Sequence, residues 1–184
     1  MFSGLYPHTL GHRTLTYLLQ NHERNLFRDL RENGYFTACF GKNDLLAQDA
    51  VISSFDLIGP KDIIYEKPWP DNPWPKGHKY YKSFYYGKRP QKMSKDFDWA
   101  CVQNACRFLD NPPSEPFCLY LPLIFVHPPY AVEEPYFSMY DRNKVPSPIP
   151  VKFENKRIFM VILHKVRGID KLNEENKREI KAVY

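Results

Sequence analysis

The sequence predicts an α/β domain with helices on both faces of a sheet, and two stretches of the chain carry this prediction. In the first stretch, residues 25–34 have the apolar spacing of a helix and lead through a glycine into the apolar strand 35–40. In the second, apolar residues recur on one helical face between Ser94 and Asn111, and the nearly all-apolar segment 117–125 follows. Helix and strand therefore alternate, as they do in a layered α/β fold.

Length and composition limit the functions that the chain can have. A domain of 184 residues can bury about 70% of its unfolded surface, so we expect a single domain over residues 1–184. The net charge of +5 suits an anionic ligand but lacks the dense basic tracts of nucleic-acid binding, and we expect no nucleic-acid partner. The longest apolar runs, 118–126 and 158–163, are too short to cross a bilayer, so we expect neither a signal peptide nor a membrane partner. No pattern predicts the oligomeric state.

The loop after the first strand is the first candidate site. Gly34 stands where a helix commonly ends in the left-handed conformation, and the strand 35–40 begins directly after it. Open α/β sheets hold ligands just beyond the carboxyl ends of their strands. Lys42 falls in such a loop and would present an ammonium there.

The segment 60–89 is rich in proline and aromatic residues. It holds seven Lys or Arg against three acidic residues, a mixture that a stacking platform for nucleic acid would use. Without a binding signature, a proline-braced surface excursion closed by a short strand at 80–86 is favoured, and the segment could also line a substrate mouth. The eight aromatic residues are Tyr65, Trp69, Trp74, Tyr80, Tyr81, Phe84, Tyr85 and Tyr86.

The second candidate site residue follows the second strand. Residues 117–125 show no polar alternation, which predicts a strand covered on both faces at the middle of the sheet. His127 comes just after this strand and is followed by two prolines. Because Lys42 and His127 both follow strands of one expected sheet, we predict that they share a pocket where an ammonium and an imidazole stabilise an oxyanion.

Helix caps are predicted at two further places. Ser94 is the expected N-cap of the helix that ends before Asn111, and Asn173 is the expected N-cap of a final helix that reaches Tyr184. Residues 157–166 fit either a helix or a strand, and the helix is favoured.

The cysteines and histidines show no metal-ligand spacing. No two cysteines form a Cys-x-x-Cys pair, and no two histidines have the His-x₃-His spacing of a helical zinc site. Buried free thiols are therefore predicted at Cys39, Cys101, Cys106 and Cys118.

Four segments together resemble the sulfatases of the alkaline phosphatase superfamily. Residues 3–8 resemble their Thr-Gly-Leu-Tyr-Pro-His segment, and 34–46 their Gly-Tyr…Gly-Lys-x-His segment. Residues 117–136 resemble their central strand with its Pro-His-x-Pro-Tyr loop, and 172–184 a late helix. The resemblance implies an internal fragment of the N-terminal catalytic domain, with part of a central mixed sheet, helices on both faces and truncation at both ends.

This resemblance implies hydrolysis of a sulfate ester. In that family a formylglycine made from cysteine attacks sulfur, and a divalent cation, usually Ca²⁺, helps lysines and histidines to neutralise the sulfate oxygens. By motif position, Lys42 would contact the sulfate and the nucleophile, and His127 would contact the sulfate near the leaving oxygen. The implied substrate is a small-molecule sulfate ester or a sulfated glycan.

The chain departs from the family pattern in two ways. Asp44 replaces the frequent histidine two places after the lysine, so it would either face a cationic substrate group or, as favoured, cap the next turn. None of the four cysteines lies in the Cys/Ser-x-Pro-x-Arg signature, and the expected metal ligands are absent as well. We therefore expect no cofactor within this chain and no activity from the isolated fragment. The alternatives are a phosphoester or phosphonate hydrolase of the same superfamily, and a non-enzymatic binding module that uses segment 60–89.

Overall fold

The computed structural model describes residues 2–12, 14–66, 70–90 and 93–184. The chain forms two compact units, each made of two stretches of sequence. The first unit comprises Met1–Glu66 and Lys95–Ile124, and the second comprises Lys67–Ser94 and Phe125–Tyr184. One domain over 1–184 stays a prediction, because two compact units can belong to one domain.

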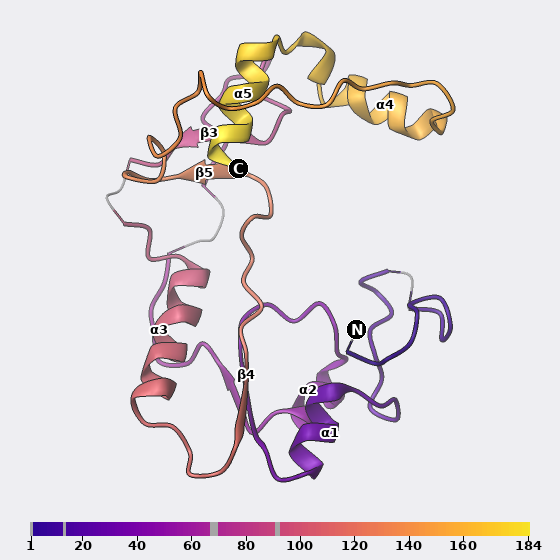
Figure 1. Cartoon of the computed structure of the whole chain (residues 1–184), viewed down its shortest axis with the longest axis vertical. Coiled ribbons are helices and arrows are strands. Elements are labelled where there is room, and N and C mark those ends of the chain that lie inside the picture. The colour runs from indigo at the N-terminus through magenta and orange to yellow at the C-terminus, as the bar shows by residue number, and fades with distance from the viewer. Residues whose placement is uncertain (1, 13, 67–69, 91–92) are drawn as a thin grey trace. The chain divides into compact units, whose positions relative to one another are not determined.

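Helices and parallel strands alternate along the chain (Figure 1). The first unit contains α1 (Leu26–Glu32), β1 (Phe36–Phe40), α2 (Gln48–Ser54), β2 (Leu57–Gly59), α3 (Phe97–Asp110) and β4 (Phe117–Tyr120). The second contains β3 (Tyr85–Lys88), β5 (Tyr130–Val132), α4 (Ile158–Val166), the 3₁₀ turn η1 (Ile169–Lys171) and α5 (Glu174–Val183). The strand orders are β2-β1-β4 and β3-β5, and these strands pair in parallel. The predicted α/β class is confirmed.

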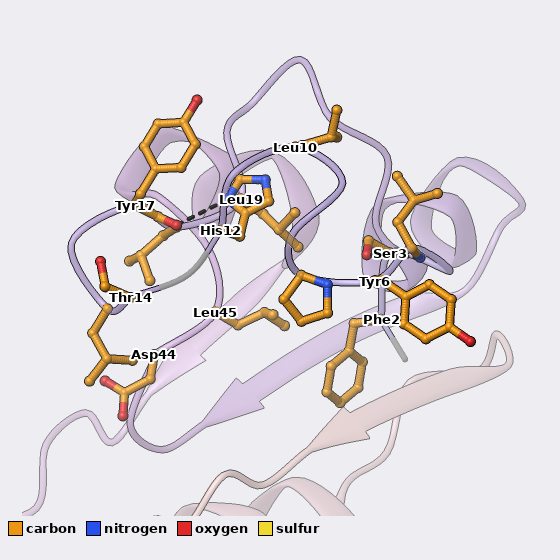
Figure 2. A pocket seen from close by; sticks show the side chains of 14 residues that line it. Phe2, Ser3, Tyr6, Leu10, His12, Thr14, Tyr17, Leu19, Asp44 and Leu45 are labelled. Atoms are coloured by element: carbon orange, nitrogen blue, oxygen red, sulfur yellow. Dashed lines mark hydrogen bonds between the residues drawn. The ribbon is translucent and has the colours of Figure 1, made fainter. Parts of the chain in front are cut away.

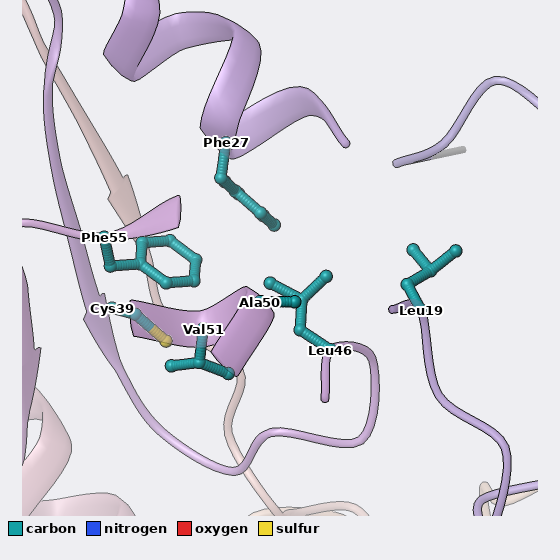
Figure 3. Packing of buried hydrophobic residues seen from close by; sticks show 7 residues of the cluster. All are labelled: Leu19, Phe27, Cys39, Leu46, Ala50, Val51 and Phe55. Atoms are coloured by element: carbon teal, nitrogen blue, oxygen red, sulfur yellow. The ribbon is translucent and has the colours of Figure 1, made fainter. Parts of the chain in front are cut away.

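The first unit has three layers, with β1 in the middle one. Alternate residues of a strand point to opposite faces of its sheet, so Cys39 faces one side, and Ala38 and Phe40 face the other. Cys39 packs into a cluster with residues of α1 and α2, shown in Figure 3. Ala38 and Phe40 pack against three buried residues of α3, Cys101, Ala105 and Phe108. Helices therefore cover both faces of this sheet, as predicted.

The start and end of α1 agree with the prediction from sequence. The Asn25 side chain, 1% exposed, accepts a hydrogen bond from the Arg28 N–H at 3.1 Å and donates one to Ser54 Oγ at 3.1 Å. It thereby satisfies an N–H of the first helical turn and ties α1 to the end of α2. Gly34 has φ of 86°, the left-handed conformation expected of a glycine after a helix.

The N-cap of α3 was assigned to the wrong residue. Asp96, not Ser94, caps the helix, since its carboxylate accepts the Trp99 N–H at 3.1 Å. In the second unit, Ser94 instead donates its N–H to the Glu133 carboxylate at 3.0 Å. Serine and aspartate are both good N-cap residue types, so residue type alone does not distinguish Ser94 from Asp96. Leu109, one of the apolar residues between Ser94 and Asn111, is 52% exposed.

The prediction of a central strand at 117–125 was wrong. β4 has four residues and lies at the edge of the sheet, whereas β1 is the central strand. None of residues 117–125 is fully buried, and Leu123 is 41% exposed. Pro122 lacks the N–H that a continuing strand would need, which explains why the ladder stops before it.

The aromatic residues of 60–89 contribute to the core of the second unit. The predicted strand at 80–86 was misplaced, because residues 79–82 form turns and β3 begins at Tyr85. Tyr80 and Tyr85 are buried against Leu172, and Trp74 packs beside them. Trp69 lies outside the described residues. For these three aromatic residues, packing within the unit explains why they are aromatic without a role in binding.

Both C-terminal helices form where the sequence predicts them. α4 is helical, as favoured, and the Asn173 side chain caps α5 by accepting the Asn176 N–H at 2.8 Å. Several apolar side chains of α4 are more than half exposed, among them Ile158 and Phe159. Among the described residues, no helix is long and apolar enough to cross a membrane.

The cysteines are free thiols, as predicted. Cys39 and Cys101 are buried and Cys118 is half-buried. Cys106 is exposed, which contradicts the prediction that all four are buried. Cys101 and Cys106 lie five positions apart on α3, so they face different sides of the helix.

Candidate anion-binding site

Lys42 lies in the loop that follows the central strand of the first unit. The N–H of Gly41 donates to the carbonyl of Gly59, at the end of β2, at 3.2 Å. The N–H of Lys42 donates to the carbonyl of Pro122, just after β4, at 2.9 Å. The backbone at Lys42 is thus attached to the chain on both sides of β1, which fixes where its side chain begins.

The close approach of two backbone segments requires a glycine before Lys42. A Cβ atom added at Gly41 would lie 2.3 Å from the carbonyl oxygen of Pro122 and 2.7 Å from its Cδ. The nearest atom belongs to the backbone, so no rotation of a side chain would relieve the clash. Gly41 therefore allows the hydrogen bond between Lys42 and Pro122.

The ammonium of Lys42 forms an ion pair with Asp44. Lys42 Nζ lies 2.7 Å from Asp44 Oδ2, and the two side chains are 41% and 43% exposed. An ammonium has three N–H donors, so the pair leaves Lys42 able to donate to a further acceptor. The pair also places a carboxylate next to the proposed anion contact.

Asn43, not Asp44, caps the turn after Lys42. Asn43 Oδ1 accepts the N–H groups of Leu45 and Leu46 at 3.2 and 2.9 Å, and its Nδ2 donates to the Leu46 carbonyl at 2.6 Å. The favoured capping role of Asp44 was therefore wrong. Leu46, 1% exposed, anchors the turn in the core, so the turn is closed by both hydrogen bonding and burial.

His127 belongs to the second unit and is exposed. Its Nδ1 lies 2.6 Å from the carbonyl oxygen of Pro128. A carbonyl only accepts, so Nδ1 carries the hydrogen, and Nε2 then carries one only in the imidazolium form. Lys42 and His127 lie in different units, and their convergence on one pocket stays a prediction.

A pocket of about 480 Å³ is lined in part by Asp44, the ion-pair partner of Lys42, and Figure 2 shows Asp44 among the lining residues. Asp44 and Leu45 contribute from the turn after β1, and the rest of the lining comes from residues 2–19. This N-terminal segment is held by backbone hydrogen bonds, from the Leu19 N–H to the Leu45 carbonyl at 3.0 Å and from the Ala47 N–H to the Leu19 carbonyl at 2.8 Å. The sequence did not predict this pocket.

A second side-chain pair, His12 with Glu23, includes a residue of the pocket wall, His12. His12 Nε2 is 2.8 Å from Glu23 Oε1, and His12 Nδ1 is 3.0 Å from the Tyr17 carbonyl. Hydrogen bonds to Glu23 and then to Tyr17 raise the pKa of His12. Burial favours protonation of Glu23, but hydrogen bonds from the Gln20 N–H and His12 prevail and lower its pKa. The sequence did not reveal this pair, because Glu23 is eleven residues away from His12.

The described residues do not form a metal site. No cluster of three or more His, Cys, Asp or Glu side chains occurs among them. The exposed thiol, Cys106, is followed by Arg-Phe-Leu and so lies outside the signature that is converted to formylglycine. The donor groups that the structure describes therefore do not fit a bound Ca²⁺ ion.

A family model described as Sulfatase matches residues 1–171 of the 184. The match includes Lys42, Asp44 and His127 and ends just before α5. No match to a curated protein was found. The family match covers most of the chain and includes three of the four segments identified from sequence, whereas the fourth, 172–184, lies outside it.

Proposed function

Because the chain belongs to the sulfatase family, we propose that it provides the sulfate-binding part of a sulfuric ester hydrolase. The single observation that supports this proposal most is the position of Lys42, fixed by hydrogen bonding at the carboxyl end of the central strand β1. Parallel sheets hold ligands at this edge, and sulfatases act on sulfate esters. The substrate would be a sulfated small molecule or a sulfated glycan.

In this proposal Lys42 donates a hydrogen bond from its ammonium to a sulfate oxygen. The charged donor makes a stronger bond than a neutral one, and the fixed backbone reduces the freedom lost on binding. Asp44 opposes this role, since its carboxylate already takes one donor of Lys42 and repels an incoming anion. The ion pair therefore weakens sulfate binding without abolishing it.

His127 would donate to the sulfate through Nε2. Because Nδ1 donates to Pro128, this requires the imidazolium form, which adds a second positive charge near the ester oxygen that leaves.

The chain by itself should bind sulfate without hydrolysing an ester. Sulfatases generally use a divalent metal and a formylglycine. None of the four cysteines lies in the signature for that modification, and the described residues offer no metal cluster. Lys42 and His127 stabilise charge only where a nucleophile creates it. Assays of an aryl sulfate, with and without Ca²⁺, should therefore remain at background.

Titration with sodium sulfate at constant ionic strength, followed by NMR, tests the binding site. Lys42→Ala and His127→Ala should each weaken binding about three- to tenfold, as expected for loss of one charged hydrogen bond at an exposed site. Matched controls are Lys76→Ala and His8→Ala, which remove exposed residues of the same kinds elsewhere. Equal effects of test and control variants would contradict the proposal.

The affinity for inorganic phosphate distinguishes a sulfatase site from its nearest alternative, the site of a phosphoester hydrolase. A phosphoester site should prefer the dianionic phosphate, whereas the proposed site should bind sulfate at least as tightly as phosphate at pH 7.

Turnover of an aryl sulfate that Lys42→Ala abolishes would show that the chain is active by itself. Such a result would contradict the expected inactivity and support the sulfatase chemistry.

A further inference from the structure

The pocket beside Lys42 has the dimensions of a ligand site. At about 480 Å³ it falls within the range of about 300–1,000 Å³ that is usual for small-molecule pockets. Its lining includes Asp44, which is also the ion-pair partner of Lys42 (Figure 2). One side chain thus lies in the pocket wall and contacts the ammonium proposed to hold sulfate.

The pocket wall is mainly apolar. Two aromatic side chains, Tyr6 and Tyr17, border it and are 77% and 48% exposed, and Leu15 is 66% exposed. Apolar side chains left open around a hollow gain most when an apolar ligand removes them from water. The remaining apolar lining residues are Phe2, Leu5, Pro7, Leu10, Leu18, Leu19 and Leu45.

Polar groups are few in this lining. Four polar side chains line the pocket, Ser3, His12, Thr14 and Asp44, and each already has a partner. Glu23 and the Tyr17 carbonyl engage the His12 ring, and Lys42 engages Asp44. Ser3 Oγ accepts the Leu5 N–H, and the Thr14 hydroxyl bonds to that of Thr16. A sugar ring would bring several hydroxyl groups, and burying them without partners costs free energy. The wall therefore favours an apolar ring over a glycan.

The pocket wall is held in place before any ligand arrives. The Leu26 N–H donates to the Phe2 carbonyl at 2.8 Å, and the Phe2 ring stacks on Phe27 with ring centroids 5.1 Å apart. On the other side, Leu19 is bonded to the Leu45 carbonyl, and His12 is paired with Glu23. A wall with these fixed points loses little conformational freedom on binding, which favours affinity.

We propose that this pocket binds the alcohol part of the sulfate ester, and that this alcohol carries an apolar ring, either aromatic or alicyclic. The inference rests on the proposed function, because the ring would enter the pocket while the sulfate faces Lys42 beyond Asp44. It narrows the substrate class from any sulfate ester to one whose alcohol carries an apolar ring.

Three probes test the inference with the full 184-residue chain: methyl sulfate, 1-naphthyl sulfate and 1-naphthol, each titrated at constant ionic strength. Removing the naphthyl ring from water should make 1-naphthyl sulfate bind at least about tenfold more tightly than methyl sulfate. Tyr6→Ser should remove much of this advantage and leave methyl sulfate unchanged. Tyr140→Ser is the matched control, since Tyr140 is 59% exposed and does not line the pocket.

The outcomes separate this inference from the proposed function. If Lys42→Ala weakens the binding of methyl sulfate, but 1-naphthyl sulfate binds no more tightly than methyl sulfate, the inference is wrong and the proposed function stands. If both naphthyl compounds bind equally, depend on Tyr6 and ignore Lys42→Ala, the sulfate site itself is wrong and the inference falls with it. A sulfated disaccharide that binds as tightly as 1-naphthyl sulfate and depends equally on Tyr6 would overturn the apolar class.

Discussion

The Lys42 ammonium lies 2.7 Å from the Asp44 carboxylate, two positions further along the same turn. Sulfatases that the chain resembles frequently carry a histidine at the second position, so an anion here replaces a group able to donate. The pair is exposed, which limits its contribution to stability to about 0–1 kcal/mol. Its main consequence therefore concerns the anion that Lys42 can bind.

Asp44→Asn should strengthen sulfate binding. The substitution keeps the size of the side chain, removes the repulsive charge and frees the ammonium, so affinity should rise about three- to tenfold. NMR titration at constant ionic strength gives the affinity. Glu32→Gln is the matched control, because Glu32 is an exposed acid of α1 and precedes the other end of β1. Equal gains in sulfate affinity from Asp44→Asn and Glu32→Gln would mean that the net charge of the chain, and not the charge beside Lys42, determines sulfate binding.

Gly41→Ala should destabilise the first unit and displace Lys42. The added Cβ would meet the Pro122 carbonyl at 2.3 Å, and such overpacking typically costs about 1–3 kcal/mol. Urea unfolding gives the loss, and sulfate titration shows whether the loop has moved. Gly34→Asn is the control, since nothing lies within 4 Å of an added Cβ there and asparagine tolerates the left-handed conformation. A variant of Gly41 as stable as this control would contradict the close approach.

The cysteines should react with a thiol reagent in a defined order. Burial raises the pKa of Cys39 to about 11 and that of Cys101, which also lies near Asp98, to about 12. Both thiols should resist iodoacetamide at pH 8, whereas the exposed Cys106 should react first. Mass spectrometry of the native chain gives the order, and Cys106→Ser should remove the fast phase. In the denatured chain all four cysteines should react at similar rates; early labelling of Cys39 in the native chain would contradict its burial.

The His12–Glu23 pair should make stability depend on pH. The pKa of His12 is raised above its ordinary value of 6.5, so its contribution is complete below about pH 6.5 and is lost as the pH rises through the folded-state value. The pKa of Glu23 is lowered below 4.5, so its contribution is complete above about pH 4.5 and is lost as the pH falls through the folded-state value. The pair therefore stabilises the chain most between these two limits.

His12→Gln should flatten the upper part of this profile. Thermal unfolding between pH 5 and 8 should show the wild-type chain losing more stability than the variant as the pH rises. His8→Gln serves as the control, because His8 lies in the same segment but is exposed and stacks only on Tyr6 among the aromatic contacts described for it. If both variants follow the wild-type profile, the pair does not link protonation to folding.

The loop at Lys42 was predictable because its signals are local. A capped helix, a left-handed glycine and a short apolar strand follow one another directly, and each constrains the next. The edge position of β4 was not predictable in the same way, since an apolar run without alternation fits any strand that is covered on both sides. Only its pairing with β1, some eighty positions away, decides the order of the strands.

At the candidate site, too, the sequence predicts local features better than contacts between distant residues. The end of the first strand placed Lys42 in its loop, but the capping role expected of Asp44 belongs to its neighbour Asn43, and Asp44 pairs with Lys42 instead. The pocket was missed because its wall comes from a segment without regular structure, whose apolar residues have no periodicity to reveal a common face. The contacts that define it join residues 2–19 to the turn after β1.

The strand order β2-β1-β4 also determines when the lysine loop can take its shape during synthesis. β2 follows β1 after one short helix and can pair with it early, but β4 is made only after residues 67–94, which belong to the other unit. Until then one edge of β1 has no partner, and the Pro122 carbonyl that receives the Lys42 N–H does not yet exist. A nascent chain that stops short of Phe117 would therefore present an open strand edge, a site at which chains associate with one another.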